Sequence, residues 1–186
     1  MSIILDAYTE EIVGWSVGPS LEAIYPLEAM KMALRRLDGK AAVNLIHHSD
    51  RGIQYACSDY VGLLNRNHIS ISMTETGDPK DNAQAERINN TMKNELLKDM
   101  RFTSLGEVIA AVTRAVDFYN NERPHMSIDM MTPVQAATCE GAIKKWWISY
   151  REQAILRARS LENPENSLSL PVVQGSPSGL RPSVNP

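Results

Sequence analysis

Two acidic residues stand at positions that suit phosphoryl-transfer chemistry. Asp50 directly follows a short apolar stretch of strand length, and α/β sheets place their ligands at the carboxyl ends of such strands. Glu86 lies in a segment whose apolar residues recur at helical spacing. Carboxylate oxygens suit hard cations such as Mg²⁺, and two such ions clamp the attacking and leaving oxygens of an in-line phosphoryl transfer. Asp50 and Glu86 are therefore candidate metal ligands.

Each of these carboxylates has a simpler interpretation when it is taken alone. Asp50 can merely open the turn formed by Asp-Arg-Gly, since aspartate is a common turn residue. Glu86 can be an ordinary solvated glutamate on a helix that also carries Lys93. The occurrence of both residues in one chain favours the metal site.

The motifs around the two carboxylates resemble a known family, the catalytic domain of IS3-group transposases, which is related to retroviral integrases. Residues 48–55 read His-Ser-Asp-Arg-Gly-x-Gln-Tyr and look like the family's second-aspartate motif. Thirty-five residues separate Asp50 from Glu86, a spacing typical of the family. Residues 77–86 are similar to its loop-and-helix motif around the glutamate. Further similarity lies in residues 5–8, 12–15, 119–125 and 132–133.

The resemblance implies an α/β, ribonuclease-H-like fold, in which a mixed sheet is flanked by helices. It also implies DNA transposition by metal-dependent phosphoryl transfer, with two Mg²⁺ or Mn²⁺ ions and with Asp50 and Glu86 as catalytic ligands. The partners would be transposon-end and target DNA, and the intact transposase would be a homo-oligomer. The DNA-binding candidates are Lys93, Arg51, Asn90, Arg87 and Arg123.

One departure from the family limits this expectation. The family's first catalytic aspartate lies on a strand before the one that ends near Asp6, so we expect the first strand to be missing and this chain alone to be inactive. Asp6 itself is expected to form a turn. The alternatives are a catalytically dead remnant that binds DNA or interferes with assembly and, less favoured, a nuclease that cuts RNA in hybrids.

Bulk properties limit the remaining functions. The net charge of −3 and the pI near 5.8 exclude a domain held on nucleic acid by overall positive charge, so DNA contacts must be local. Cys57 and Cys139 lie far apart and are expected to be reduced and structural. His47 and His48 are adjacent on a strand and point to opposite faces, which argues against a shared metal. The start of the chain predicts neither export nor a membrane span, and the resemblance implies a location in the bacterial cytoplasm.

The elements that must position these residues follow from hydrophobic periodicity and capping signals. Three domains are expected: an integrase catalytic core over residues 1–140, a helical extension over 141–161 and a disordered tail over 162–186. The predicted strands cover residues 3–5, 11–17, 42–47 and 69–73, and the predicted helices cover 26–39, 58–66, 81–98, 105–120 and a short segment from 132.

Overall fold

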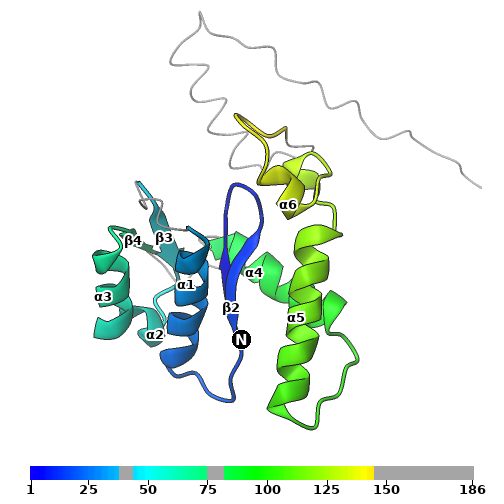
Figure 1. Ribbon diagram of the computed structural model, residues 1–186. Coiled ribbons are helices and arrows are strands. Elements are labelled where there is room, and N and C mark those ends of the chain that lie inside the picture. Colours follow the sequence, from blue (N-terminus) through cyan, green and yellow to red (C-terminus); the bar gives the residue numbers. More distant parts are fainter. Residues whose placement is uncertain (38–43, 75–81, 145–186) are drawn as a thin grey trace, which may run out of the picture. The chain divides into compact units, whose positions relative to one another are not determined.

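The computed structural model describes residues 1–37, 44–74 and 82–144, and Figure 1 shows how their helices and strands are arranged. The expected helix from residue 142 and the tail after it lie almost entirely outside these ranges. None of the described helices is long and apolar enough to cross a membrane. The elements in chain order are β1 (Ser2–Leu5), β2 (Ile12–Ser16), α1 (Ile24–Arg36), β3 (Ile46–Ser49), α2 (Ile53–Ala56), α3 (Ser58–Arg66), β4 (Ser70–Met73), α4 (Ala83–Asn90), η2 (Thr91–Leu96), α5 (Leu105–Asn121), η3 (Met126–Ile128) and α6 (Pro133–Ala136).

Strands β1 and β2 form the predicted antiparallel hairpin. Asp6 forms its turn as expected, because its Oδ1 accepts the backbone N–H groups of Tyr8 at 2.8 Å and Thr9 at 3.2 Å. The register of the hairpin shifts between Ile4 and Leu5, which leaves one extra residue in β2. A bulge of this kind changes which face the following side chain occupies.

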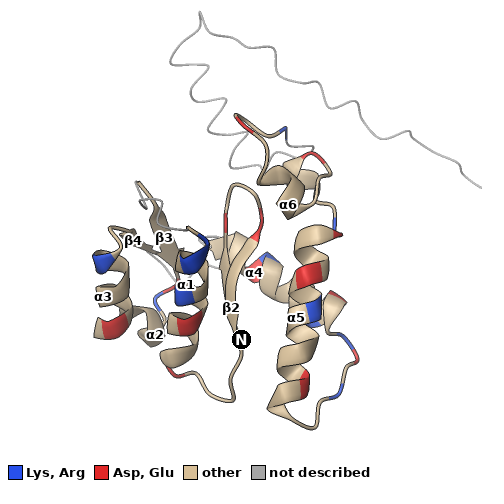
Figure 2. Ribbon diagram, viewed as in Figure 1, with Lys and Arg blue, Asp and Glu red and all other residues tan. Residues whose placement is uncertain are grey.

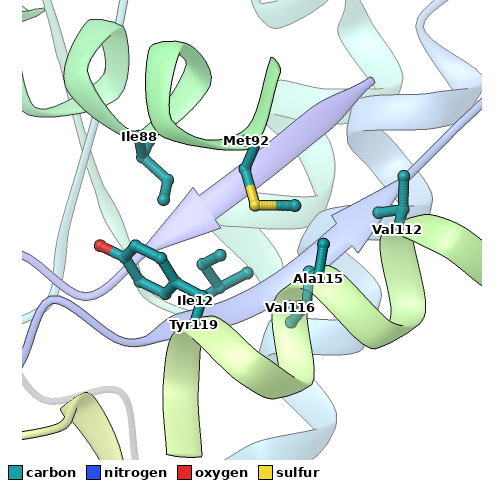
Figure 3. Close-up of a cluster of buried hydrophobic side chains, with 7 residues drawn as sticks. All are labelled: Ile12, Ile88, Met92, Val112, Ala115, Val116 and Tyr119. Carbon is teal, nitrogen blue, oxygen red and sulfur yellow. The ribbon is translucent and has the colours of Figure 1, made fainter. Parts of the chain in front are cut away.

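The bulge places large apolar residues on one face of the hairpin. Ile12 is paired with Leu5 and is only 2% exposed. It packs in an apolar cluster with residues of α4, η2 and α5, which we call the α5 cluster (Figure 3). Side chains of the continuous α4–η2 segment, of α5 and of β2 point toward one another there. The members of the α5 cluster are Ile12, Ile88, Met92, Val112, Ala115, Val116 and Tyr119.

The opposite face of the hairpin packs against α1. Ile4 pairs with Gly14, and a Cβ atom built on Gly14 would lie 2.1 Å from the carbonyl oxygen of Ala29 in α1. Helix α1 therefore approaches the strand backbone more closely than any larger residue would permit. Ile4 also contacts a second apolar cluster, the α3 cluster, whose buried members are Met30, Tyr60, Leu64 and Ile69.

Strands β3 and β4 form a separate parallel pair, with α2 and α3 as the connection between them. A crossover helix is the usual way to join parallel strands. Both strand directions expected for a mixed sheet thus occur, divided in the described residues between two two-stranded sheets. Strand β3 begins at Ile46, whereas the predicted strand begins at residue 42; residues 42 and 43 lie outside the described residues. Asn44, within the predicted strand, has φ +62°, a left-handed conformation that interrupts extended backbone.

The helices after β4 differ from prediction in two details. The helix expected to run to residue 98 is α-helical only to Asn90 and continues as the π-helical segment η2. Its N-cap position is occupied by Asn82, whose side chain accepts no capping hydrogen bond, while Asp81 lies outside the described residues. Helix α5 begins at the predicted cap, since Ser104 accepts the N–H of Glu107. Its apolar stripe is buried at Val112, Val116 and Tyr119 but largely exposed nearer its start.

Candidate active site

Asp50 lies immediately after β3 and is exposed to solvent. Its Oδ1 accepts the backbone N–H of Gly52 at 2.9 Å, which is the turn that the Asp-Arg-Gly sequence predicts. This hydrogen bond also holds the carboxylate in place, so the turn orients it. Asp50 therefore shapes the turn and also presents its carboxylate at the carboxyl end of a parallel strand.

Arg51 connects the ends of the two parallel strands. Its Nε donates to the carbonyl oxygen of Thr74 at 2.7 Å, and Thr74 directly follows β4. The backbone N–H of Thr74 in turn donates to the carbonyl oxygen of Ser49 at 3.1 Å. The side chain of Arg51 thus ties the segment that carries Asp50 to the start of the connection toward α4.

Glu86 lies in the first turn of α4, exposed to solvent. Within the part of the chain that the structure describes, its carboxylate forms no hydrogen bond and no ion pair. A negative charge in a first turn is stabilised by the unpaired N–H groups of the helix end. Glu86 is therefore a charged group that is available to a ligand.

Asn90 and Lys93 are exposed like Glu86. Asn90 is the last residue of α4, and its Oδ1 accepts a hydrogen bond from Asn94 at 3.4 Å. Lys93 lies in η2, where the π-helical turn alters the spacing expected of a regular α-helix. Figure 2 shows how the charged positions are distributed over these elements.

The structure places Asp50 and Glu86 on separate elements, without a shared hydrogen-bond partner among the described residues. The connection between β4 and α4, residues 75–81, lies outside the described residues. Among the residues that are described, no group of three His, Cys, Asp or Glu side chains is arranged to hold a metal ion. Carboxylate oxygens nonetheless suit Mg²⁺ as ligands. In proteins this ion usually keeps several bound waters, so one or two protein carboxylates are sufficient.

Arg87, the residue after Glu86, is bound to the hairpin turn. Its Nη2 lies 2.9 Å from Oε1 of Glu10, and the hydroxyl of Ser127 donates to the same oxygen at 3.2 Å. The side chain of Glu10 is only 5% exposed, whereas that of Arg87 is 54% exposed. Arg87 was a DNA-binding candidate on sequence grounds, and the structure shows that its guanidinium already has an anionic partner.

Arg123 is engaged in a similar way. Its Nη2 lies 3.0 Å from Oε2 of Glu95, its Nη1 lies 3.3 Å from Nδ1 of His125, and its guanidinium carbon lies 5.9 Å from the centre of the Tyr119 ring. Because arginine only donates, Nδ1 of His125 is the acceptor. Burial, together with the positive charges of Arg123 and Arg87, lowers the pKa of His125 to about 4. The imidazole is therefore neutral at physiological pH.

Asn120 has a structural role that sequence reasoning missed. Its Oδ1 accepts the backbone N–H of Ile12 at 2.9 Å, and its Nδ2 donates to the carbonyl oxygen of the same residue at 3.0 Å. The amide thus satisfies both backbone groups of Ile12 and joins α5 to β2. The available signal was a polar residue at a buried position of the α5 stripe, next to Tyr119.

His47 packs against two tyrosine rings. Its Nε2 lies 3.1 Å from the hydroxyl oxygen of Tyr60, and its ring lies beside those of Tyr55 and Tyr60, at centroid distances of 6.3 and 5.5 Å. Burial, assisted by the neighbouring His48, lowers the pKa of His47 to about 4. A neutral imidazole packed on two tyrosine rings belongs to the apolar interior.

Comparison with protein families gives two matches, both to models of the integrase core domain, over residues 1–79 and 67–133. The chain is 35% identical over 138 residues to the transposase for insertion sequence element IS629 of Shigella sonnei, covering 73% of this chain and 45% of the relative. It is 32% identical over 136 residues to transposase InsF for insertion sequence IS3A of Escherichia coli, covering 73% and 46%. The chain thus spans about half the length of the relatives it matches.

Solved structures provide an independent comparison. The HTLV-2 integrase catalytic core domain in complex with magnesium, in its trimeric form, matches with a TM-score of 0.50 at 18% identity, over 71% of this chain and 80% of that one. A simian T-cell lymphotropic virus intasome in complex with the PP2A regulatory subunit B56 gamma matches with a TM-score of 0.51 at 14% identity, over 72% and 46%. At such identities the likeness is one of fold.

Proposed function

Because this chain belongs to the integrase core domain family and is related in sequence to IS3-group transposases, we propose that it is catalytic-domain sequence of a DNA transposase. Its mixed α/β fold is that of retroviral integrase cores, the ribonuclease-H-like fold expected from the motifs. The observation that carries the proposal is the pair of exposed carboxylates, Asp50 at the end of β3 and Glu86 in the first turn of α4.

Asp50 and Glu86 are proposed to hold the divalent ions. When bound, two Mg²⁺ or Mn²⁺ ions would stabilise the charge that develops on the attacking and leaving oxygens at a DNA phosphate. Asp50 contributes a carboxylate oriented by the Gly52 N–H, and Glu86 contributes one without a partner in the described residues. The HTLV-2 core of similar fold is in complex with magnesium, which makes magnesium the first ion to test.

DNA contacts are proposed for the exposed flank of the Glu86 helix. Lys93 and Asn90 are exposed and would meet phosphate oxygens, which positions DNA without reading its sequence. Arg51 lies beside Asp50, although its Nε is already bound to Thr74, so only its terminal nitrogens would remain for phosphate. The ion pairs of Arg87 and Arg123 favour a positioning role for those two residues over direct DNA contact.

The activity of the chain by itself is a separate proposal. Asp50 and Glu86 are proposed as two of the metal carboxylates, and we propose that these two alone do not support the joining of DNA strands. The complete transposase would act as a homo-oligomer on transposon ends in the bacterial cytoplasm. The alternative is a remnant without catalysis, which binds DNA or interferes with the assembly of an intact copy.

Manganese titration tests the carboxylate pair directly. In the full chain, the electron paramagnetic resonance signal of free Mn²⁺ is expected to fall as the ion binds, and Asp50→Asn and Glu86→Gln should each weaken binding by about tenfold or more, since each removes a charged ligand. Glu122→Gln, which neutralises an exposed glutamate at the end of α5, is the matched control. Binding that is unchanged in both Asp50→Asn and Glu86→Gln would contradict the assignment.

A DNA assay separates the two functional alternatives. Supercoiled plasmid is incubated with the full chain and Mg²⁺ or Mn²⁺, and nicking and binding are measured on the same samples. Metal-dependent nicking that disappears in Asp50→Asn would show that the chain by itself is an active enzyme and would contradict the proposal that it is inactive alone. Binding without nicking, together with reduced activity of an intact transposase in a mixture, supports the remnant.

A further inference from the structure

The turn between β1 and β2 carries two adjacent buried glutamates, and each is bound to a different helix. The side chain of Glu10 is 5% exposed and is paired with Arg87 of α4 at 2.9 Å. The side chain of Glu11 is 7% exposed and is paired with Arg36 of α1 at 2.5 Å. A buried carboxylate is costly unless it is paired, so each pair fixes its helix to the hairpin. Figure 2 shows acidic residues, in red, at the hairpin turn.

Glu10 is held in an unfavourable backbone conformation. Its φ is +59°, in the left-handed region that glycine and asparagine adopt more easily than glutamate. A glutamate at such a position is best explained by its side chain, because the backbone alone would favour a smaller residue. That side chain has two partners from distant segments, Arg87 and Ser127.

A second contact ties the same helix to the same turn. Nε2 of Gln84 donates to the carbonyl oxygen of Ala7 at 3.4 Å, and Arg87 reaches Glu10 three residues later. Positions three residues apart lie on one face of a helix, so Gln84 and Arg87 both face the hairpin turn. Glu86 lies between them in sequence and is exposed to solvent.

We propose that Glu10 is a positioning residue for Glu86, acting through Arg87. The Glu10–Arg87 pair sets the rotation and position of the first turns of α4, and thereby the place at which the Glu86 carboxylate meets its metal ion. Arg87 serves in this pair and not as a ligand of DNA phosphate. This inference rests on the proposed metal-binding role of Glu86.

The competing role of Arg87 gives opposite expectations for a change at Glu10. If Arg87 bound DNA, Glu10→Gln would release its guanidinium and leave DNA affinity equal or higher. If Arg87 positions α4, Glu10→Gln and Arg87→Gln must have the same consequence, because each breaks the same pair. The double variant must then be no worse than either single variant, since residues that act as one unit are not additive.

The test uses the full chain and measures hydrogen exchange of the α4 amides together with Mn²⁺ affinity. In Glu10→Gln, Arg87→Gln and the double variant, we expect α4 amides to exchange on the order of tenfold faster, as loss of a charged hydrogen bond would produce. Mn²⁺ affinity should fall in all three by a similar factor, and Arg87→Lys should restore part of both. Glu11→Gln is the matched control, since it breaks an equally buried pair on α1 and should leave α4 exchange unchanged.

Unchanged α4 exchange in Glu10→Gln would overturn the proposal, as would a loss of DNA affinity in Arg87→Gln that Glu10→Gln does not share. Should Glu10→Gln fail to fold, Arg87→Gln provides the same test, because the Arg87 side chain is half exposed. A wrong assignment of Glu86 as a metal ligand would be recognised separately. Mn²⁺ affinity would then be insensitive to Glu86→Gln, and the loss of α4 protection in Glu10→Gln would still be observed.

Discussion

Individual polar side chains join the helices to the hairpin. Asn120 of α5 satisfies both backbone groups of Ile12, and Glu10 reaches Arg87 of α4. Asn120 and Glu10 are buried, and an unsatisfied polar group is more costly in the interior than in water. Each bond therefore selects one arrangement of helix and strand from the many that apolar packing alone would accept.

Replacement of Asn120 by alanine is expected to lower the free energy of unfolding by about 2–4 kcal/mol, since it leaves two buried backbone groups of Ile12 without a partner. Urea denaturation followed by circular dichroism measures the change. Asn121→Ala is the control: its amide bonds to Asp117 on the exposed side of α5, and its effect should stay within about 0.5 kcal/mol. Equal effects at both positions would contradict the bridging role of Asn120.

Elements are positioned by capping and by close backbone approach. Ser104 caps α5, and Thr132 with Gln135 forms a complete capping box on α6, so both helices begin where their local sequence determines. Helix α1 is placed differently, by the contact of its Ala29 with Gly14 of β2. This contact fixes how closely α1 approaches the hairpin, on the face opposite the α5 cluster.

Gly14→Ala should destabilise the domain by about 1–3 kcal/mol or more, because its Cβ would lie 2.1 Å from the Ala29 carbonyl oxygen and the helix must move away. The matched variant is Gly106→Ala in α5, whose Cβ would meet only the Ser104 Oγ at 3.9 Å. Gly106→Ala is expected to be neutral or to stabilise by about 0.5 kcal/mol. Thermal unfolding compares the two; a harmless alanine at position 14 would disprove the close approach.

At the scale of the whole described unit, the hairpin joins two apolar clusters. The α5 cluster contacts one face through Ile12 and the α3 cluster contacts the other through Ile4. Each cluster borders a histidine with a lowered pKa. The ring of His125 lies 4.6 Å from that of Tyr119, and the ring of His47 lies 5.5 Å from that of Tyr60. Protonation of either histidine would place a charge against the interior.

Stability should fall as the pH falls from about 6.5 to about 4. In the folded protein both His47 and His125 have a pKa of about 4, whereas the ordinary value is 6.5. Between these values the unfolded chain binds more protons than the folded one, which favours unfolding. The loss is complete below the folded pKa and absent above pH 7.

Urea midpoints measured from pH 7.5 to pH 4.5 provide the check. His125→Gln keeps an acceptor for Arg123 but cannot titrate, so its midpoint should depend on pH about half as strongly. His68→Gln, at an exposed position, is the control and should keep the full dependence. A wild-type midpoint that does not change over this range would show that the two histidines are not held neutral by the fold.

Features that depend on local interactions could be predicted from the amino-acid sequence. Strand and helix periods, the Asp6 turn, the Ser104 cap and the Thr132 capping box all involve residues a few positions apart, so they can be predicted without the fold. The motifs around Asp50 and Glu86 likewise predicted the family, and with it the ribonuclease-H-like class.

The pairing of distant polar groups could not be predicted from the sequence and is seen in the folded structure. Glu10 and Arg87 are 77 residues apart, and Ile12 and Asn120 are 108 apart, so no local pattern identifies these pairs. For the same reason the sequence shows Arg87 only as a cation, and the ion pair through which it holds α4 is seen in the structure. A bond of this kind forms only when packing has brought distant segments together, because its own energy is too small to order the chain between them.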